Sequence, residues 1–229
     1  MKQKTATGLW LLGAFLLWTG AVCVVDVQAI GPLGTAVGLA AVNGFFHRLT
    51  GVHMALYTVT DWLGLVLLAV VAGFGCLGLV QWVKGKRLRK VDRSILVLGG
   101  FYLAVLAAYG IFETVLINYR PVLINGNLES SYPSSTTMLA MCVMPTAMMQ
   151  LQGRIQNRTL RRWILLLMGA FTAFMVIGRL LSGVHWLTDV IGGALLSAGL
   201  VRFRQLDVHR HGRTPGVGSA ELLHRHPHR

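Results

Sequence analysis

The residues of this sequence best suited to chemistry are two arginines, two serines, a histidine and an aspartate: Arg120, Ser134, Ser135, Arg179, His185 and Asp189. Two guanidiniums can hold the oxygens of a phosphoryl group through paired hydrogen bonds. The two serines follow Pro133 at the start of an expected helix, where hydroxyls and free backbone N–H groups also favour an anion. Together these residue types predict a phosphate-binding site.

His185 and Asp189 add a nucleophile to this predicted site. They are four residues apart, so on a helix both side chains project from one face. A carboxylate that accepts a hydrogen bond from one ring nitrogen fixes the tautomer and leaves the other nitrogen as a nucleophile or base. No set of metal-ligating residues accompanies the pair, so we expect chemistry without a metal or another cofactor.

The elements that must position these residues are membrane helices. Hydrophobic residues make up 54% of the 229 residues and charged residues 13%, against about 25% charged residues in a soluble domain. A helix needs about 20 apolar residues to cross the hydrocarbon core of a membrane. We therefore predict an all-α integral membrane protein with six transmembrane helices, near residues 7–26, 61–83, 95–117, 133–151, 163–181 and 185–202.

The basic residues predict how these helices are oriented. With six spans, every Lys and Arg except Arg48, Arg120 and Arg179 falls on one side of the membrane. By the positive-inside rule that side is the cytoplasm, so both termini lie inside and the predicted phosphate site faces outside. The short loops and the charge bias suggest a bacterial plasma membrane. We expect the formal net charge of +13 to face membrane lipid rather than nucleic acid.

We expect one membrane domain over 1–201, with the motif residues within 113–189, followed by a basic, histidine-rich cytoplasmic tail over 202–229 that is mostly disordered. The histidines of the tail can bind a metal, but a solvated tail near anionic lipid is the favoured interpretation. Apolar residues recur at helical spacing over 39–49, which fits either a helix in the outer membrane interface or a packed loop. The length of the first apolar stretch favours a retained helix over a cleaved signal peptide.

The order Arg-Pro, then Pro-Ser-Ser, then Arg-x5-His-x3-Asp resembles the signature of the type 2 phosphatidic acid phosphatase (PAP2) superfamily, whose members form a six-helix bundle. The third motif, from Arg179 to Asp189, is its most specific part. The resemblance implies that His185 attacks phosphorus to form a phosphohistidine and that Asp189 orients it. It also implies that Arg120, Arg179 and Ser134 bind the phosphate. Substrates of this family are lipid phosphates, lipid diphosphates and some soluble phosphate esters, cleaved without a metal.

Two positions depart from the family signature. Glu113 stands where the first motif has a lysine, and Thr136 stands where the second motif has the histidine that protonates the leaving group. The first change replaces a phosphate-binding cation with an anion, which we expect to pair with a neighbouring arginine. The second removes a general acid, a role worth roughly 10²–10⁴ in rate.

We therefore predict that the protein hydrolyses phosphoric esters or diphosphates, as a lipid phosphatase or diphosphatase. Three alternatives account for the absence of the second-motif histidine. In the first alternative the protein is a weak or inactive relative that binds lipid phosphates. In the second, His47 or His53 of the outer loop supplies the proton. In the third alternative the substrate needs no proton, because a lipid monophosphate that leaves from a diphosphate is already a stable anion. That alternative favours an isoprenoid or other lipid diphosphate over phosphatidic acid.

Overall fold

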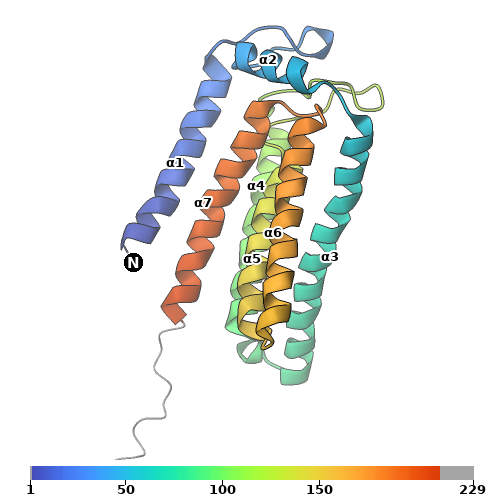
Figure 1. Ribbon diagram of the computed structural model, residues 1–229. Coiled ribbons are helices and arrows are strands. Elements are labelled where there is room, and N and C mark those ends of the chain that lie inside the picture. The colour runs from blue at the N-terminus through green and yellow to red at the C-terminus, as the bar shows by residue number, and fades with distance from the viewer. Residues whose placement is uncertain (1, 212–229) are drawn as a thin grey trace, which may run out of the picture.

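The computed structural model describes residues 2–211. Within this range the chain is helical and has no β-strand, with single-turn 3₁₀ helices η1 (Pro32–Gly34) and η2 (Leu88–Lys90). Its α-helices are α1 (Lys2–Val24), α2 (Ala40–Thr50), α3 (Met54–Gly85), α4 (Arg93–Thr114), α5 (Ser135–Arg154), α6 (Arg158–Leu181) and α7 (Leu187–His211). In Figure 1 the long helices run roughly alongside one another, and α2 lies across one end of the bundle, hereafter the α2 end.

Among residues 2–211, four helices are long and apolar enough to cross a membrane: α3, α4, α6 and the Thr5–Val24 part of α1. The helices α5 and α7 are not in this group. They lie inside the bundle, where α5 packs on α3, α4, α6 and α7, and α7 packs on α1, α4, α5 and α6. A helix shielded from lipid can carry polar side chains, as α5 does with the buried Thr137, Thr146 and Gln150. The predicted all-helical membrane fold is confirmed, and a crossing by α5 and α7 stays a prediction.

The last helix runs further than predicted. Because α7 continues to His211, residues 202–211 are helical, and the prediction of a disordered tail from 202 onward is wrong for them. A Cβ built on Gly8 of α1 would lie 3.0 Å from the Phe203 ring, so α1 packs against this extension and supports it. The remainder of the predicted tail, 212–229, lies outside the described residues.

Two apolar clusters hold the bundle together, and α5 contributes to both. The first joins Phe15 of α1, Met138 of α5 and Leu196 of α7. The second joins Leu67 of α3 and Met175 of α6 to the opposite face of α5. Because α5 is packed from both sides, its first turn is fixed relative to the start of α7 and the end of α6. Those three helix ends carry the second and third sequence motifs.

The segment over 39–49 forms a helix, α2, rather than a packed loop. Asn43 on its buried side donates to Gly38 O at 2.8 Å and to Thr188 Oγ1 at 3.0 Å, and its Oδ1 accepts from Thr188 N at 3.2 Å. Its other side exposes apolar side chains, as expected of a helix that lies in a membrane interface: Val42, Phe45 and Leu49. Through Asn43, α2 is fixed to the first turn of α7.

The connection between α6 and α7, residues 182–186, is held tightly against the segment that follows α2. The His53 N–H donates to Ser182 O at 2.9 Å. Gly183 has a φ of +67°, and a Cβ built on it would lie 1.9 Å from Gly51 O. Only a glycine fits this backbone conformation and this close approach without strain. The contact sets the position of His185, two residues later.

We predict that Gly183→Ala destabilises the protein more than Gly34→Ala does. Both glycines have positive φ, at +67° and +76°, so each substitution costs about 1–2 kcal/mol through the backbone. Gly34 has open space around its Cβ position, whereas Gly183 meets a carbonyl oxygen. Thermal melting of the two variants in detergent measures the difference. Equal melting temperatures would show that the 182–186 connection is not held by this contact.

Candidate functional site

The candidate site lies at the α2 end, where two connections meet. One is the α4–α5 connection, which folds back on itself through an isolated antiparallel bridge between Tyr119 and Ser130. Arg120 N–H donates to Glu129 O at 3.0 Å, and Ser131 N–H donates to Asn118 O at 2.9 Å. The other is the α6–α7 connection with His185. The paired backbone therefore presents Arg120 and Ser131 to His185.

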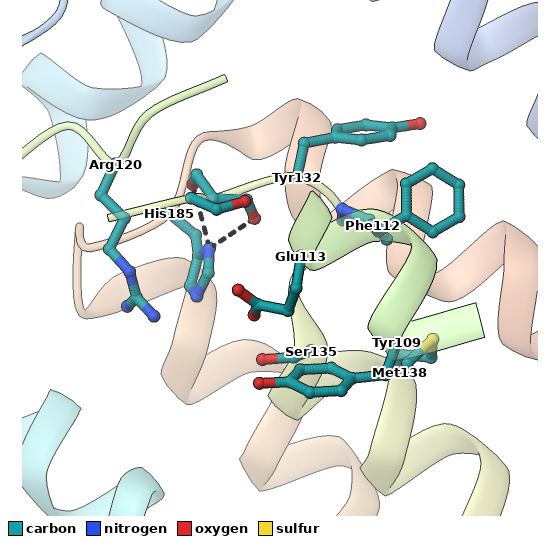
Figure 2. A pocket seen from close by; sticks show the side chains of 11 residues that line it. Tyr109, Phe112, Glu113, Arg120, Tyr132, Ser135, Met138 and His185 are labelled. Atoms are coloured by element: carbon teal, nitrogen blue, oxygen red, sulfur yellow. Dashed lines mark hydrogen bonds between the residues drawn. The ribbon is translucent and has the colours of Figure 1, made fainter. Parts of the chain in front are cut away.

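The imidazole of His185 is held in one tautomer. Its Nδ1 lies 3.2 Å from both Ser131 O and Ser131 Oγ, and 3.7 Å from Asp189 Oδ2. Two of these contacts are drawn as dashed lines in Figure 2. A carbonyl oxygen only accepts hydrogen bonds, so Nδ1 carries the proton and Nε2 keeps its lone pair. Nε2 is buried and has no hydrogen-bond partner among residues 2–211.

Burial also keeps this imidazole neutral. His185 lies in the connection between α6 and α7, and burial lowers its pKa to about 4 even though the nearby Asp189 carboxylate acts in the opposite direction. The nearby guanidiniums of Arg120 and Arg179 lower the pKa further. A neutral imidazole with a free Nε2 is the form that can attack phosphorus.

Asp189 is fully buried and is fixed by three donors. Its Oδ2 accepts from Trp186 N at 2.8 Å and from the Ser131 hydroxyl, and its Oδ1 lies 3.4 Å from Asn118 Nδ2. Sequence reasoning assigned no role to Asn118, Ser131 or Trp186. Their positions follow from the folded-back α4–α5 connection, and no local spacing in the sequence indicates them.

The two arginines lie close together around one aromatic ring. The Cζ atoms of Arg179 and Arg120 lie 4.8 and 5.8 Å from the centroid of the Tyr57 ring. Arg179 is 2% exposed, and its Nη2 donates to Asp61 Oδ1 at 2.9 Å and to Thr136 Oγ1 at 2.6 Å. Tyr57 and Asp61 are further site residues that the sequence did not indicate, because nothing in the sequence marked the start of α3 as part of the site.

Parts of both guanidiniums remain without hydrogen bonds within the described range. Arg120 Nε lies 3.1 Å from Glu129 Oε2, although its N–H is not aimed for a hydrogen bond. Arg120 Nη1 and the Nε and Nη1 of Arg179 are buried without a hydrogen-bond partner. Buried cationic donors are costly unless paired. This arrangement favours the binding of an anion.

A small cavity brings several of the predicted residues together. It is lined by Arg120, Ser135, His185 and Glu113, among others, and Arg179 is not part of its lining. Figure 2 shows Glu113, Ser135 and His185 around the same space. Ser134 is not among the residues that line it.

The two serines at the start of α5 therefore differ. The backbone N–H of Ser134 donates to Asp189 O at 3.0 Å, and its hydroxyl accepts from Thr137 Oγ1 at 3.0 Å. Ser134 thus joins α5 to α7, whereas the neighbouring Ser135 faces the cavity.

The two divergent positions also have defined surroundings. Glu113 lines the cavity, and its carboxylate interacts with Tyr109 one helical turn earlier. The expectation that Glu113 pairs with an arginine is wrong in the part of the chain that the structure describes, because Arg120 pairs with Glu129 and Arg179 with Asp61. Thr136 accepts a hydrogen bond from Arg179.

The outer histidines do not line the cavity. The His47 ring packs against the Trp186 ring at 5.4 Å between centroids. His53 Nε2 lies 2.9 Å from Thr50 O. Among residues 2–211, no group of three His, Cys, Asp or Glu side chains is placed to hold a metal ion.

Comparison with known proteins gives a family for this region. No curated protein sequence matches the chain. Its fold is similar to that of a solved structure, the first transmembrane PAP2 type phosphatidylglycerolphosphate phosphatase from Bacillus subtilis, with a TM-score of 0.55 and 19% sequence identity over 91% of this chain and 98% of that chain. Residues 111–213 match the PAP2 superfamily. The matched region carries all of the candidate catalytic and phosphate-binding residues.

Proposed function

We propose that the protein is a metal-independent lipid phosphatase or diphosphatase that works through a phosphohistidine intermediate on His185. The observation that carries the proposal is the unpartnered Nε2 of His185, which lies buried beside the unpaired donors of Arg120 and Arg179. A nucleophile and two cations with free N–H groups suit a phosphoryl group, which offers an electrophilic phosphorus and anionic oxygens.

The reaction follows from these positions in two steps. His185 Nε2 attacks phosphorus and the bond from phosphorus to the leaving-group oxygen breaks, with its electron pair staying on that oxygen, while the guanidiniums of Arg120 and Arg179 neutralise the developing charge. Asp189 stabilises the positive charge that forms on the imidazole. Water then attacks the phosphohistidine, inorganic phosphate leaves, and Nε2 regains its lone pair. Ser135 contributes a hydroxyl to phosphate binding, and Ser134 keeps the first turn of α5 in place.

The proposed substrate arrives from the membrane. Under this proposal α1 and α3 to α7 all cross the bilayer, both termini are cytoplasmic, and the α2 end faces outside in a bacterial plasma membrane. The positive-inside rule supports this orientation, because the basic segments over 84–93 and 154–162 lie at the other end of the bundle. The exposed apolar side of α2 suits the outer interface. A phosphate head group at that depth can reach the cavity.

A second candidate function has one observation in its favour. Arg179 is already bonded to Asp61 and Thr136, which leaves fewer of its donors for a substrate. A PAP2 protein with this restraint, and without the second-motif histidine, would bind lipid phosphates rather than cleave them. In that case Thr136→His would release Arg179, supply an acid, and produce turnover that the wild-type protein lacks.

We predict that His185→Ala abolishes phosphate release by the full-length protein in detergent, from both phosphatidic acid and a long-chain isoprenoid diphosphate. The variant lacks the attacking nitrogen, so the loss does not depend on the leaving group. The matched control is His53→Ala, which removes a histidine at the same end of the bundle that does not line the cavity, and we expect it to keep its activity. Phosphate release that survives in His185→Ala would refute the proposed mechanism.

The pH dependence gives an independent prediction. Protonation of Nε2 removes the nucleophile, and burial lowers the pKa of His185 to about 4. We therefore expect the fall in kcat/KM that protonation of His185 causes, corrected for ionisation of the substrate, to lie at about pH 4, where a protonated imidazole cannot attack. An acid limb centred at about pH 6.5, the value of a histidine in water, would show that His185 is not buried in the working enzyme.

A further inference from the structure

Glu113 is an acidic side chain in the wall of a cavity that otherwise suits an anion. It comes from the last turn of α4 and shares the cavity with Arg120, Ser135 and His185, which come from three other parts of the chain. In Figure 2 its carboxylate points into the space between the His185 ring and the Ser135 side chain. No ion pair within residues 2–211 involves Glu113.

A carboxylate at this place opposes phosphate binding as long as it carries its charge. A protonated carboxyl group has the opposite effect, because it donates a hydrogen bond to a phosphate or ester oxygen. A phosphoryl group bound beside a carboxyl group favours this protonated form, since two like charges in one site disfavour each other. A carboxyl group at this place can therefore act as an acid toward a bound substrate.

We propose that Glu113 is the general acid that protonates the leaving group, an inference that rests on the proposed phosphatase function. As His185 Nε2 bonds to phosphorus, the ester P–O bond breaks and its electron pair stays on the lipid oxygen. That oxygen takes the proton of Glu113, and the lipid leaves as an alcohol. The Glu113 carboxylate then takes a proton from the water that cleaves the P–N bond, which restores both side chains.

The other candidates for the acid are placed less well. Asp61 is in an ion pair with Arg179 at 2.9 Å and does not line the cavity. His47 packs on Trp186, and His53 contacts the Thr50 carbonyl, both outside the cavity. Thr136 accepts from Arg179 and has no acidic proton of suitable strength. Tyr109 shares the cavity with Glu113, and its interaction with the carboxylate supports the orientation of that side chain.

A general acid at Glu113 changes the expected substrate range. An alkyl phosphate monoester needs a proton on its leaving oxygen, and Glu113 can deliver it. The threonine at position 136 then no longer implies a preference for lipid diphosphates.

The test compares two substrates that differ in their need for a proton. Dodecyl phosphate releases an alkoxide that must be protonated. The phosphate monoester of a nitrophenol with a dodecyl chain on its ring releases a stable phenolate instead. We expect Glu113→Gln to lower kcat for dodecyl phosphate by at least about 100-fold and for the nitrophenyl ester by less than about threefold, since only the first uses the acid. Glu113→Asp keeps a carboxyl group and should recover part of the lost activity on dodecyl phosphate.

The matched control is Glu129→Gln, which removes one negative charge at the same end of the bundle without touching the cavity wall. Because Glu129 contacts Arg120, this change should shift both substrates by the same factor. An equal loss on both substrates in Glu113→Gln would make Glu113 structural, and a gain on both would make it a repulsive charge. No change on either substrate would also overturn the proposal. If His185→Ala hydrolyses both esters as well as the wild type does, the proposed function itself fails.

Discussion

The cost of burying two incompletely paired guanidiniums beside one imidazole is the constraint around which this site is built. Arg179 is 2% exposed, and its ionic partner Asp61 has a side chain that is 59% exposed, so this pair only partly offsets the lost solvation. Tyr57 covers both guanidiniums with its ring. Their remaining N–H groups, like His185 Nε2, have no hydrogen-bond partner in the described part of the chain. An anion bound between them would remove much of that cost.

The surrounding structure keeps this arrangement in place. Ser131 contacts the imidazole directly, and Ser131 and Asn118 hold Asp189 next to it. Gly183 lets the connection that carries His185 pack against the segment after α2. The central helix α5 brings Ser135 to the same point, because it is packed from both sides. Polar groups that would be costly in lipid are thereby collected at one end of the bundle, inside a shell of helices whose outer sides are apolar.

The sequence predicted the class of fold and most of the residues that meet at the α2 end. Long apolar stretches and the spacing of Arg179, His185 and Asp189 are local features, so they can be recognised without a structure. Contacts made by Asn118, Tyr57 and Asp61 depend on how distant segments pack, and no spacing reveals them. The pairing expected for Glu113 was wrong for the same reason: the arginines have Glu129 and Asp61 as partners, and both acids lie in segments whose packing the sequence does not show.

The central claim is that His185 Nε2 forms a bond to phosphorus, and trapping the phosphorylated protein tests it most directly. The full-length protein would be mixed with a ³²P-labelled lipid phosphate, quenched in alkali within milliseconds, digested and analysed by mass spectrometry. The account predicts a phosphoryl group on His185 that is stable in alkali, is lost in acid, and appears and decays fast enough to account for turnover. Turnover without label on His185, or label on another residue, would contradict it.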